Sequence, residues 1–565
     1  MKNLRLCWAA FGLCVSLGVS AQRGSCGTGV SWALADGTLT ISGEGNMTDF
    51  TDPRYGSSNL PSWDIYKDNI VKVVIEGGVK HVGSYAFYDY SNLQAVTFAE
   101  GVKSIGSSAF YGCEGIKELL FPSSMKIISG QHNTNEDAEP QVSTFGMGGT
   151  GTAYMSSEAF RGCAGLTSVT IPRGVIGVGS GTFKNCRNLK SVYWDVADYP
   201  SYGFSTANEN GFRDYGTQGS SPFSGCRLKE VVFGSEVDSI PGGLLYGQSE
   251  LSAIKFSGKT EYVGKDAFKE TVWFDNLPNG LVYIDKAAYA FKGLMSTPTA
   301  ISIAEGTKSI TEGLFANQTY LTKVTVPSTL TYMGYEVFEG CRSLGEVEWN
   351  AEDCKFGQTY GAPFSATALY TITFGEKVRK IPDGLCSGCR YITEVKMPAS
   401  VVEVGESAFS DCSGLEAVGF SENMTSIEAR AFLDCAKLSE LILPNSLREI
   451  GENAFSGCTG LETLSIPESV DSIGRSAFYN TGLEILVFNA RNCMLVYESY
   501  STAFPSSVRE LEFGDAVECI PKYMCSKMTN LMKLKVGRNV REMPSNCFSN
   551  CKNLETVEWN AVSME

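Results

Sequence analysis

Histidine is nearly absent from this chain, which has only His81 and His132 among 565 residues. With so few histidines, the sequence supports neither a Ser-His-Asp arrangement nor a histidine-based metal site. Basic residues are also few, because 46 Lys and Arg stand against 62 Asp and Glu for a net charge of -16. The basic residues are scattered and form no stripe, which argues against nucleic acid as a partner.

Long apolar runs are missing after the N-terminus. A cationic start and an apolar run from Leu6 to Val19 are followed by small residues up to Ala21. This pattern is typical of a secretory signal peptide, and the run falls short of the roughly 20 apolar residues that a membrane span needs. We therefore expect residues 1–21 to be a cleaved leader, with cleavage between Ala21 and Gln22. The mature product is expected to be secreted, with no membrane span.

The chain also lacks linkers and changes of composition. Its 60 glycines and its 19% of charged residues are spread evenly. A chain of this length would ordinarily form three or four globular domains. An evenly built chain indicates a repeat array instead.

A unit of about 23 residues recurs, with the pattern L-x-x-V-x-I-P-x-x-V-x-x-I-G-x-x-A-F-x-x-C. It is clearest where Phe432 and Cys435 recur as Phe455 and Cys458. The phenylalanine position is found at Phe87, Phe110, Phe160, Phe183, Phe223, Phe268, Phe291, Phe315, Phe338, Phe364, Phe409, Phe432, Phe455, Phe478, Phe504 and Phe548, and Leu245, Cys386 and Cys525 fill its other places. These positions predict about 19 turns of a solenoid.

The residues of one unit predict how each turn folds. Alternation from Leu464 to Ile466 predicts a short strand that ends at Pro467. The small Ala477 beside Phe478 predicts a compact turn. Seven buried apolar side chains contribute ~10–20 kcal/mol, which is less than the ordering cost of ~1–2 kcal/mol for each of about 23 residues. One unit therefore cannot fold alone, and stacking must supply the difference. We predict a β-rich, right-handed leucine-rich-repeat solenoid with a parallel sheet on one side and turns or helical coils on the other.

The two ends of the array differ. Residues 22–69 are predicted to form an N-terminal capping region, because residues 30–41 alternate around an Asp-Gly turn as a hairpin does. The array is predicted over residues 70–565 and ends in mid-repeat after Trp559. It contains two polar, glycine-rich insertions, near residues 129–155 and 197–221, which we expect to be surface loops.

Ten cysteines lie three residues after the repeat phenylalanine position, among them Cys113, Cys163, Cys186, Cys341, Cys412, Cys435 and Cys458. A small apolar side chain at this position predicts buried packing, so we expect mostly free, buried thiols. Cys386 and Cys389 form a C-x-x-C, but they occupy the ordinary phenylalanine and cysteine positions of one unit. We therefore expect packing there, and neither redox nor zinc chemistry.

Other chemical sites find little support. The acidic residues beside His132 lack the spacing of a calcium loop. The glycine-rich residues 146–151 lack the Lys-Ser/Thr of a phosphate loop. Composition cannot exclude a glycosidase, because 62 acidic residues offer many carboxylate pairs, but no pair stands out. We expect no catalytic residue, metal or cofactor, and we predict that the protein is not an enzyme.

The strands offer a continuous surface, because residues between the buried positions point outward in every turn. The candidate binding residues on this face are Tyr193, Lys255, Thr325, Glu348, Lys396, Ser465, Glu512 and Lys535. One interpretation is a solvated sheet face without a ligand. The other is a long docking surface whose many weak contacts bind an extended partner.

The repeated unit resembles the BspA-like family of bacterial surface leucine-rich repeats, from about Ile70 to Trp559. The segment from Gly280 to Gly293 also looks like a variant coil of that family. The resemblance implies a protein secreted by or displayed on a bacterium. It also implies an adhesin that binds host matrix or plasma proteins, other bacteria or innate receptors. Because no motif defines the binding residues of the family, none is carried over.

Three functions stay open. The first is an adhesin with an extracellular protein ligand. The second is a secreted protein that binds or cleaves glycans, suggested by Tyr193, Trp194, Tyr199 and Tyr202 near one insertion. The third is a rigid spacer without a ligand.

Overall fold

The computed structural model describes residues 22–55, 59–129, 157–197, 221–357, 362–495, 503–545 and 547–562. The expected leader up to Ala21 and nearly all of both expected insertions lie outside these residues. Gln22 is the first residue of strand β1, Gln22–Gly27.

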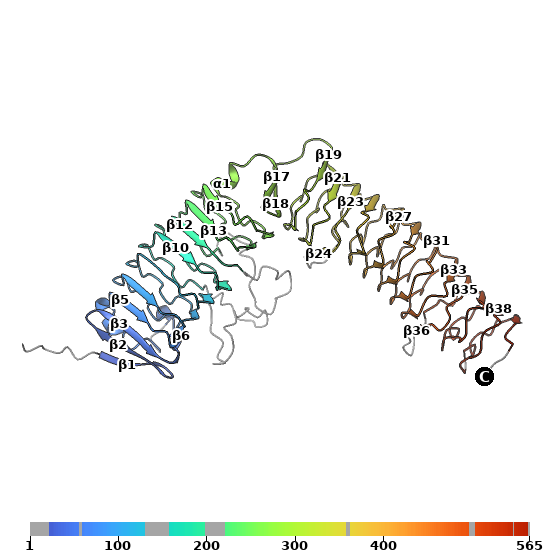
Figure 1. Ribbon diagram of the computed structural model, residues 1–565, viewed down its shortest axis with the longest axis horizontal. Coiled ribbons are helices and arrows are strands. Elements are labelled where there is room, and N and C mark those ends of the chain that lie inside the picture. The colour runs from blue at the N-terminus through green and yellow to red at the C-terminus, as the bar shows by residue number, and fades with distance from the viewer. Residues whose placement is uncertain are drawn as a thin grey trace, which may run out of the picture.

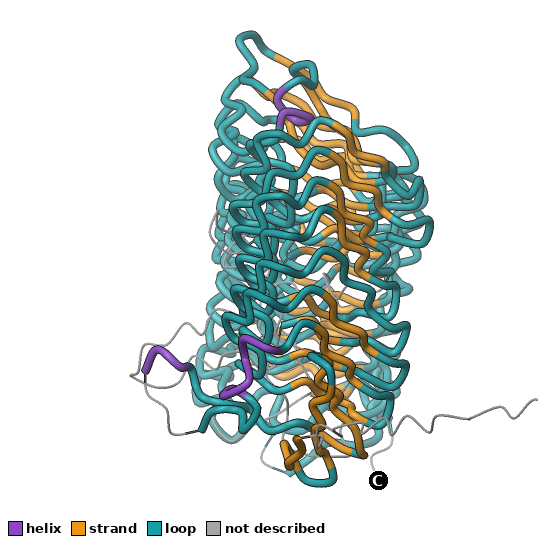
Figure 2. The backbone as a smooth tube through the Cα atoms, turned by 90° about the vertical axis from the view of Figure 1, so that its left-hand side faces the viewer, coloured by secondary structure: helices purple, strands orange, loops and turns teal. Residues whose placement is uncertain are grey.

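The chain winds into a parallel β-solenoid of about 19 turns, as predicted. Figure 1 shows that the turns stack into an arch of two arms, with one set of strands on the outer side and a second set on the inner side. Within each outer sheet, every strand pairs in parallel with the next, as Glu510 to Phe513 do with Lys533 to Val536. Figure 2 shows the strands stacked in columns beside columns of turns.

The outer strands are β5 (Lys72–Ile75), β7 (Ala95–Phe98), β10 (Ser168–Ile171), β12 (Ser191–Trp194), β13 (Glu230–Phe233), β15 (Ala253–Lys255), β19 (Thr299–Ser302), β21 (Leu321–Val326), β23 (Glu346–Trp349), β25 (Thr371–Phe374), β27 (Glu394–Lys396), β29 (Ala417–Gly419), β31 (Glu440–Leu441), β33 (Thr463–Ile466), β35 (Ile485–Phe488), β37 (Glu510–Phe513), β38 (Lys533–Val536) and β39 (Thr556–Trp559). The inner strands are β4 (Gly45–Asn46), β6 (Val79–Val82), β8 (Ser104–Ile105), β9 (Ile127–Ile128), β11 (Gly177–Val178), β14 (Ser239–Ile240), β16 (Tyr262–Val263), β20 (Ser309–Ile310), β22 (Tyr332–Met333), β24 (Lys355–Phe356), β26 (Lys380–Ile381), β28 (Glu403–Val404), β30 (Ser426–Ile427), β32 (Glu449–Ile450), β34 (Ser472–Ile473) and β36 (Met494–Leu495).

Strand β33 shows how the repeat sequence builds one turn. Leu464 and Ile466 are buried, while Thr463 and Ser465 face solvent, so the predicted alternation is confirmed. The next residue is Pro467, which cannot donate to a ladder and ends the strand. The buried side chains of each turn meet those of the neighbouring turns, which supplies the burial that a single unit lacks.

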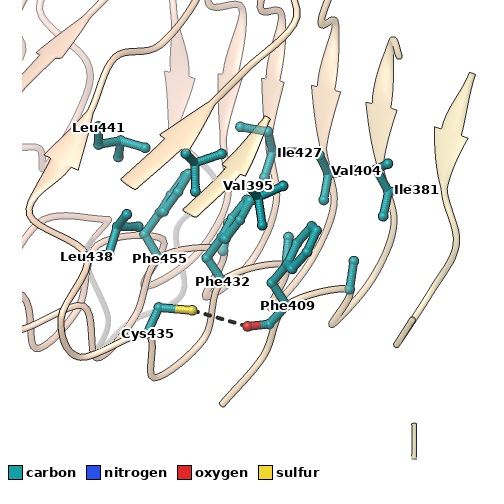
Figure 3. Close-up of a cluster of buried hydrophobic side chains, with 14 of the residues drawn as sticks. Ile381, Val395, Val404, Phe409, Ile427, Phe432, Cys435, Leu438, Leu441 and Phe455 are labelled. Carbon is teal, nitrogen blue, oxygen red and sulfur yellow. Dashed lines mark hydrogen bonds between the residues drawn. The ribbon is translucent and has the colours of Figure 1, made fainter. Parts of the chain in front are cut away.

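The repeat phenylalanines form a stack along the turn side of the core. The rings of Phe409, Phe432, Phe455 and Phe478 lie 5.3–5.4 Å apart and within 7° of parallel. Figure 3 shows three of these rings in file, pointing into the core. The residue before the Ala-Phe pair has a left-handed backbone, as in Asn453 at φ 54°. Asparagine tolerates this conformation better than most residues because its short polar side chain bonds locally.

The repeat cysteines donate a second hydrogen bond to buried carbonyl groups that also accept a backbone N–H. The Cys435 thiol donates to the Phe409 carbonyl of the preceding turn at 3.1 Å (Figure 3). Where Gln248 replaces the cysteine, its Nε2 donates to the equivalent carbonyl of Phe223 at 2.8 Å. All described cysteines are free thiols, and all but Cys519 and Cys551 are buried. The prediction of mostly free, buried thiols is therefore confirmed, and the structure adds their hydrogen-bonding role.

The glycine after the inner strand allows neighbouring turns to approach. A Cβ atom on Gly451 would lie 2.4 Å from the backbone nitrogen of Ala429 in the preceding turn. No side chain fits at this distance, so the I-G pair of the repeat marks a contact between backbones.

The N-terminal residues form an antiparallel hairpin that covers the first turn. Strands β2 (Val30–Ala35) and β3 (Thr38–Gly43) pair antiparallel over the stretch where the sequence predicts a hairpin, and β1 adds a third strand. Strand β3 then pairs in parallel with β5 and so starts the outer sheet. Short 3-10 helices at Pro53–Tyr55 and Asp64–Asn69 follow. The buried Trp63 packs edge-on against Trp32 at 5.9 Å.

A second hairpin interrupts the array at the apex of the arch (Figure 1). Strands β17 (Gly280–Ile284) and β18 (Ala287–Lys292) pair antiparallel, so the expectation of a variant coil from Gly280 to Gly293 is wrong. Phe291 lies half-buried on β18 and is tilted by 48° against Phe315, so it is not a member of a parallel stack.

The second hairpin divides the hydrophobic core in two. One cluster of buried residues ends at Tyr289, and the other begins at Ala288. Helix α1 (Val272–Asp275) closes the first core, because Trp273 packs against Phe256 and Phe268 at 5.4 and 5.2 Å. Among the described residues, outer strands β15 and β19 do not pair across this break. The inner side stays connected, since β18 pairs in parallel with β20.

Candidate protein-binding face

The predicted binding residues lie on the outer sheets in one row. Thr325 pairs with Glu348, and Glu512 pairs with Lys535, at the same position of successive strands. Tyr193 and Lys255 are both aligned through Val232. We call this line of central outward residues the outer row. It runs along the convex side of both arms and is interrupted at the second hairpin.

Several charged residues of the outer row bind one another. The Lys535 ammonium lies 2.7 Å from the Glu512 carboxylate, and the Thr325 hydroxyl donates to Glu348 at 3.2 Å. Lys396 lies 2.9 Å from Glu394 of its own strand. Exposed pairs of this kind contribute little to stability, about 0–1 kcal/mol each. The charged parts of the row are therefore a polar surface that could dock a partner without first breaking a strong internal network.

One stretch of the outer row is uncharged. The repeat spacing places Ile442 between Gly419 and Ser465, and Val487 pairs with Ser465 on the next strand. Ile442 is 83% exposed, although most residues at its position are polar. We call Gly419, Ile442, Ser465 and Val487 the apolar window. Charged strands border it on both sides, with Glu394 and Lys396 before it and Glu510 and Glu512 after it.

A groove opens beside Ile442. Its volume is about 430 Å³, and its lining residues are Leu441, Ile442, Leu443, Asn445, Ser465, Pro467, Glu468, Asn489 and Ala516. The groove lies where the parallel ladder is interrupted. Strand β31 pairs with β29, but among the described residues it does not pair with β33. Of the predicted row, only Ser465 lines this groove.

The sequence reasoning missed Ile442, although a signal was present. The unit E-L-I-L-P has an apolar residue where most units have a polar one, and the unit E-L-L-F-P places Leu120 at the same position. Leu120 is also exposed, and its turn forms no described outer strand, whereas the turn of Ile442 forms only the two-residue strand β31. An outward apolar residue in a repeat whose neighbours are polar therefore marked two of the places where the described outer strands do not pair.

A Ser-His-Asp chain is present near the first turn, contrary to expectation. His81 Nδ1 lies 2.8 Å from the Ser104 hydroxyl, and His81 Nε2 lies 3.3 Å from Asp49 Oδ1. The Ser84 backbone N–H also donates to Asp49 at 2.7 Å. Burial alone would raise the pKa of Asp49, but the hydrogen bond and charge of His81, with the bond from Ser84, hold that pKa below its usual value.

The order of burial opposes a catalytic role for this chain of residues. Ser104 and His81 are buried, whereas the Asp49 side chain is half-exposed. A nucleophile must reach its substrate, and here the acid faces solvent while the hydroxyl does not. The three residues join the end of the capping region to inner strands β6 and β8.

The residues proposed for glycan recognition near the second insertion do not form one site. Trp194 is fully buried in the core, so it cannot stack on a ligand, and that part of the hypothesis is wrong. Tyr193 is exposed on the outer row. Tyr199 and Tyr202 lie outside the described residues.

The C-x-x-C pair has the environment of a packed core and not that of a reactive site. Cys386 and Cys389 are buried in the core, where burial raises the pKa of the Cys386 thiol and so disfavours a reactive thiolate. Within the described ranges, no three His, Cys, Asp or Glu side chains are close enough to hold a metal ion. In the same residues, no helix has the length and apolar character that crossing a bilayer requires.

Comparison with known protein families shows to which family this repeat array is related. The chain matches the family described as BspA type leucine-rich repeat region in six copies, over residues 58–136, 149–215, 213–294, 285–416, 379–501 and 425–555. The chain belongs to this family. The matched stretches include nearly all of the described solenoid. The predicted unit of about 23 residues is therefore the BspA-type repeat. None of the curated proteins compared with the chain matches it.

Several solved structures have similar repeats. A leucine-rich repeat protein from Bacteroides ovatus is 16% identical, with 94% of this chain and 98% of that chain covered and a TM-score of 0.25. One from Eubacterium ventriosum is 19% identical, with 78% and 95% covered and a TM-score of 0.25. A leucine rich cell surface protein from Faecalibacterium prausnitzii is 17% identical, with 96% and 98% covered and a TM-score of 0.22.

Proposed function

We propose that this BspA-type chain is a secreted or surface-displayed adhesin of a bacterium, which binds an extracellular protein on the outer face of its solenoid. The leader pattern at residues 1–21 supports export. The ligand would be a host matrix or plasma protein, or a protein on another cell. The chain would act by binding alone, without catalysis or a cofactor.

The apolar window carries the proposal. Specific protein interfaces have an apolar centre that is fully desolvated and a polar rim. Here the exposed Ile442 and the groove beside it form such a centre, and the charged pairs of β27, β37 and β38 lie along the row on either side. A partner that inserts an apolar side chain against Leu441, Leu443 and Pro467 would bury Ile442 as well.

The test is binding of residues 22–565 to immobilised matrix proteins, plasma glycoproteins and bacterial cells, before and after the change Ile442→Glu. Loss of a central apolar contact and burial of a carboxylate should weaken binding by about 30-fold or more. Met494→Glu is the matched control, because Met494 is also exposed but lies on inner strand β36. Circular dichroism and thermal unfolding would show that both variants fold.

Saturable binding that Ile442→Glu abolishes and Met494→Glu preserves would establish the adhesin and its docking site. Equal binding of both variants would remove the apolar window from the proposal. Absence of binding to every protein and cell would contradict the adhesin function itself and favour a spacer.

A further inference from the structure

Three exposed tyrosines lie along the strand-start edge of the outer sheet in the second arm. Tyr320 precedes the first buried leucine of its turn, Tyr391 has the same place three turns later, and Tyr370 lies between them just before β25. They are 46%, 64% and 53% exposed, respectively. At ~4.8 Å for each turn, Tyr320 and Tyr391 are about 14 Å apart along the solenoid axis.

The ring of Tyr370 is held in place by its neighbours. Its hydroxyl donates to Glu346 Oε1 of the preceding turn at 3.1 Å, and the same carboxylate lies 3.8 Å from the Lys323 ammonium one turn further back. The Tyr370 side chain therefore reaches back over Gly345 to the first residue of strand β23, while about half of the residue stays open to solvent.

Gly345 makes this placement possible. A Cβ atom at Gly345 would lie 2.2 Å from Cε1 and 2.8 Å from Cδ1 of Tyr370. The backbone of Gly345 is not left-handed, so its conformation does not demand glycine. Glycine is required here because the Tyr370 ring occupies the space that a Cβ atom would need. Glycine, tyrosine, carboxylate and lysine on three successive turns thus hold one aromatic ring on the surface.

We propose that Tyr320, Tyr370 and Tyr391 form a binding platform for a neutral glycan. The faces of pyranose rings carry C–H groups that pack on the electron-rich face of an aromatic ring. Glu346, Glu348, Thr371 and Thr373 beside the platform supply acceptors and hydroxyls for sugar hydroxyl groups. The stripe follows the solenoid axis, so an extended oligosaccharide would lie across successive turns.

The surroundings favour a neutral glycan over a charged one and over a protein. Two of the nearby carboxylates are paired with cations, Glu346 with Lys323 and Glu394 with Lys396, so charges of both signs lie beside the platform and no single sign attracts a charged polymer along it. The platform is flanked by the polar side chains of β23 and β25, whereas the window around Ile442 borders a groove lined by Leu441 and Leu443. It is therefore a second site, independent of the proposed protein ligand.

The experiment measures binding of residues 22–565 to neutral hexasaccharides of glucose, xylose and mannose by calorimetry, and retardation by the corresponding polysaccharides in native gels. Tyr370→Ala should weaken binding by about 10-fold, the effect of losing one aromatic contact. Gly345→Ala should weaken it similarly, because the added methyl displaces the ring without removing it. Glu346→Ala should also weaken glycan binding, because it removes the carboxylate that holds the Tyr370 hydroxyl.

Tyr479→Ala is the control, since Tyr479 is also an exposed tyrosine but follows Phe478 on the turn side, and it should bind like the wild type. Thermal unfolding would confirm that Gly345→Ala folds. Ile442→Glu should leave glycan binding unchanged, which separates this proposal from the adhesin function. The platform is refuted if no neutral glycan binds, or if Tyr370→Ala and Gly345→Ala bind as the wild type does. Loss of protein binding in these variants, with no glycan bound, would instead assign the tyrosines to a protein ligand.

Discussion

Replacing Phe455 by alanine tests the central claim that the phenylalanine stack holds the turns together. Phe455 is fully buried, and it stacks on Phe432 at 5.3 Å and on Phe478 at 5.4 Å. Phe→Ala changes in a packed core cost about 3–5 kcal/mol, since transfer free energy is lost and a cavity remains. Two lost stacking contacts place this position toward the upper end of that range.

The structure also predicts where the loss appears. Each turn contacts only its neighbours, so the destabilisation should be concentrated around residues 426–478. Hydrogen exchange measured by mass spectrometry can resolve this. A cost of about 3–5 kcal/mol raises the local opening equilibrium by about two to four orders of magnitude, and exchange in β30, β32 and β34 should accelerate accordingly.

Two matched variants sharpen the measurement. Phe291→Ala should cost less, because Phe291 is half-buried on the second hairpin and tilted against Phe315 alone. Tyr479→Ala, one residue beyond Phe478, should change stability by less than about 0.5 kcal/mol because Tyr479 is exposed. Unchanged exchange around Phe455, or a loss spread evenly over both arms, would refute the stack as a local, nearest-neighbour stabiliser.

Three further predictions concern the core and the capping region. Cys435→Val fills the space of the thiol but leaves the Phe409 carbonyl with only the Cys412 N–H as a donor, so it should cost about 0.5–1.5 kcal/mol in urea unfolding. A neutral effect would reduce the repeat cysteine to simple packing. Gly451→Ala should destabilise the protein by about 1–3 kcal/mol or more, because the added Cβ would meet the Ala429 backbone at 2.4 Å. A variant as stable as the wild type would show that the turns can separate at this point. The lowered pKa of Asp49 gives a contribution that is present above the usual aspartate pKa of about 3.9 and is lost as the pH falls below it. The difference in thermal unfolding between the wild type and Asp49→Asn should therefore be largest at pH 7. It should shrink progressively as the pH falls from about 4 towards the lowered pKa of the folded state. A gap that does not shrink in acid would contradict the charge-based explanation.

The positions of the candidate binding residues could be predicted, because the outward positions of a strand follow from alternation alone. The eight predicted residues lie at outward positions of outer strands, but the residues that each of them contacts could not be predicted. Whether Lys535 is free or bonded to Glu512 depends on the register between turns. The groove beside Ile442 depends on the broken ladder between β31 and β33, which only the stacked turns reveal.

The sequence by itself determined the repeat, its buried positions, the short strand ended by Pro467 and the buried cysteines. These features depend on residue types at a fixed spacing, and hydrophobic burial acts on every copy alike. The tertiary structure decided what one unit cannot encode. The apolar alternation of residues 280–293 suits a coil and a hairpin equally, and the left-handed Asp285 turns the chain back and divides the core. Asp49, His81 and Ser104 meet across successive turns, as do Gly345 and Tyr370. Such contacts arise from the stacking of distant segments, and no local pattern specifies them.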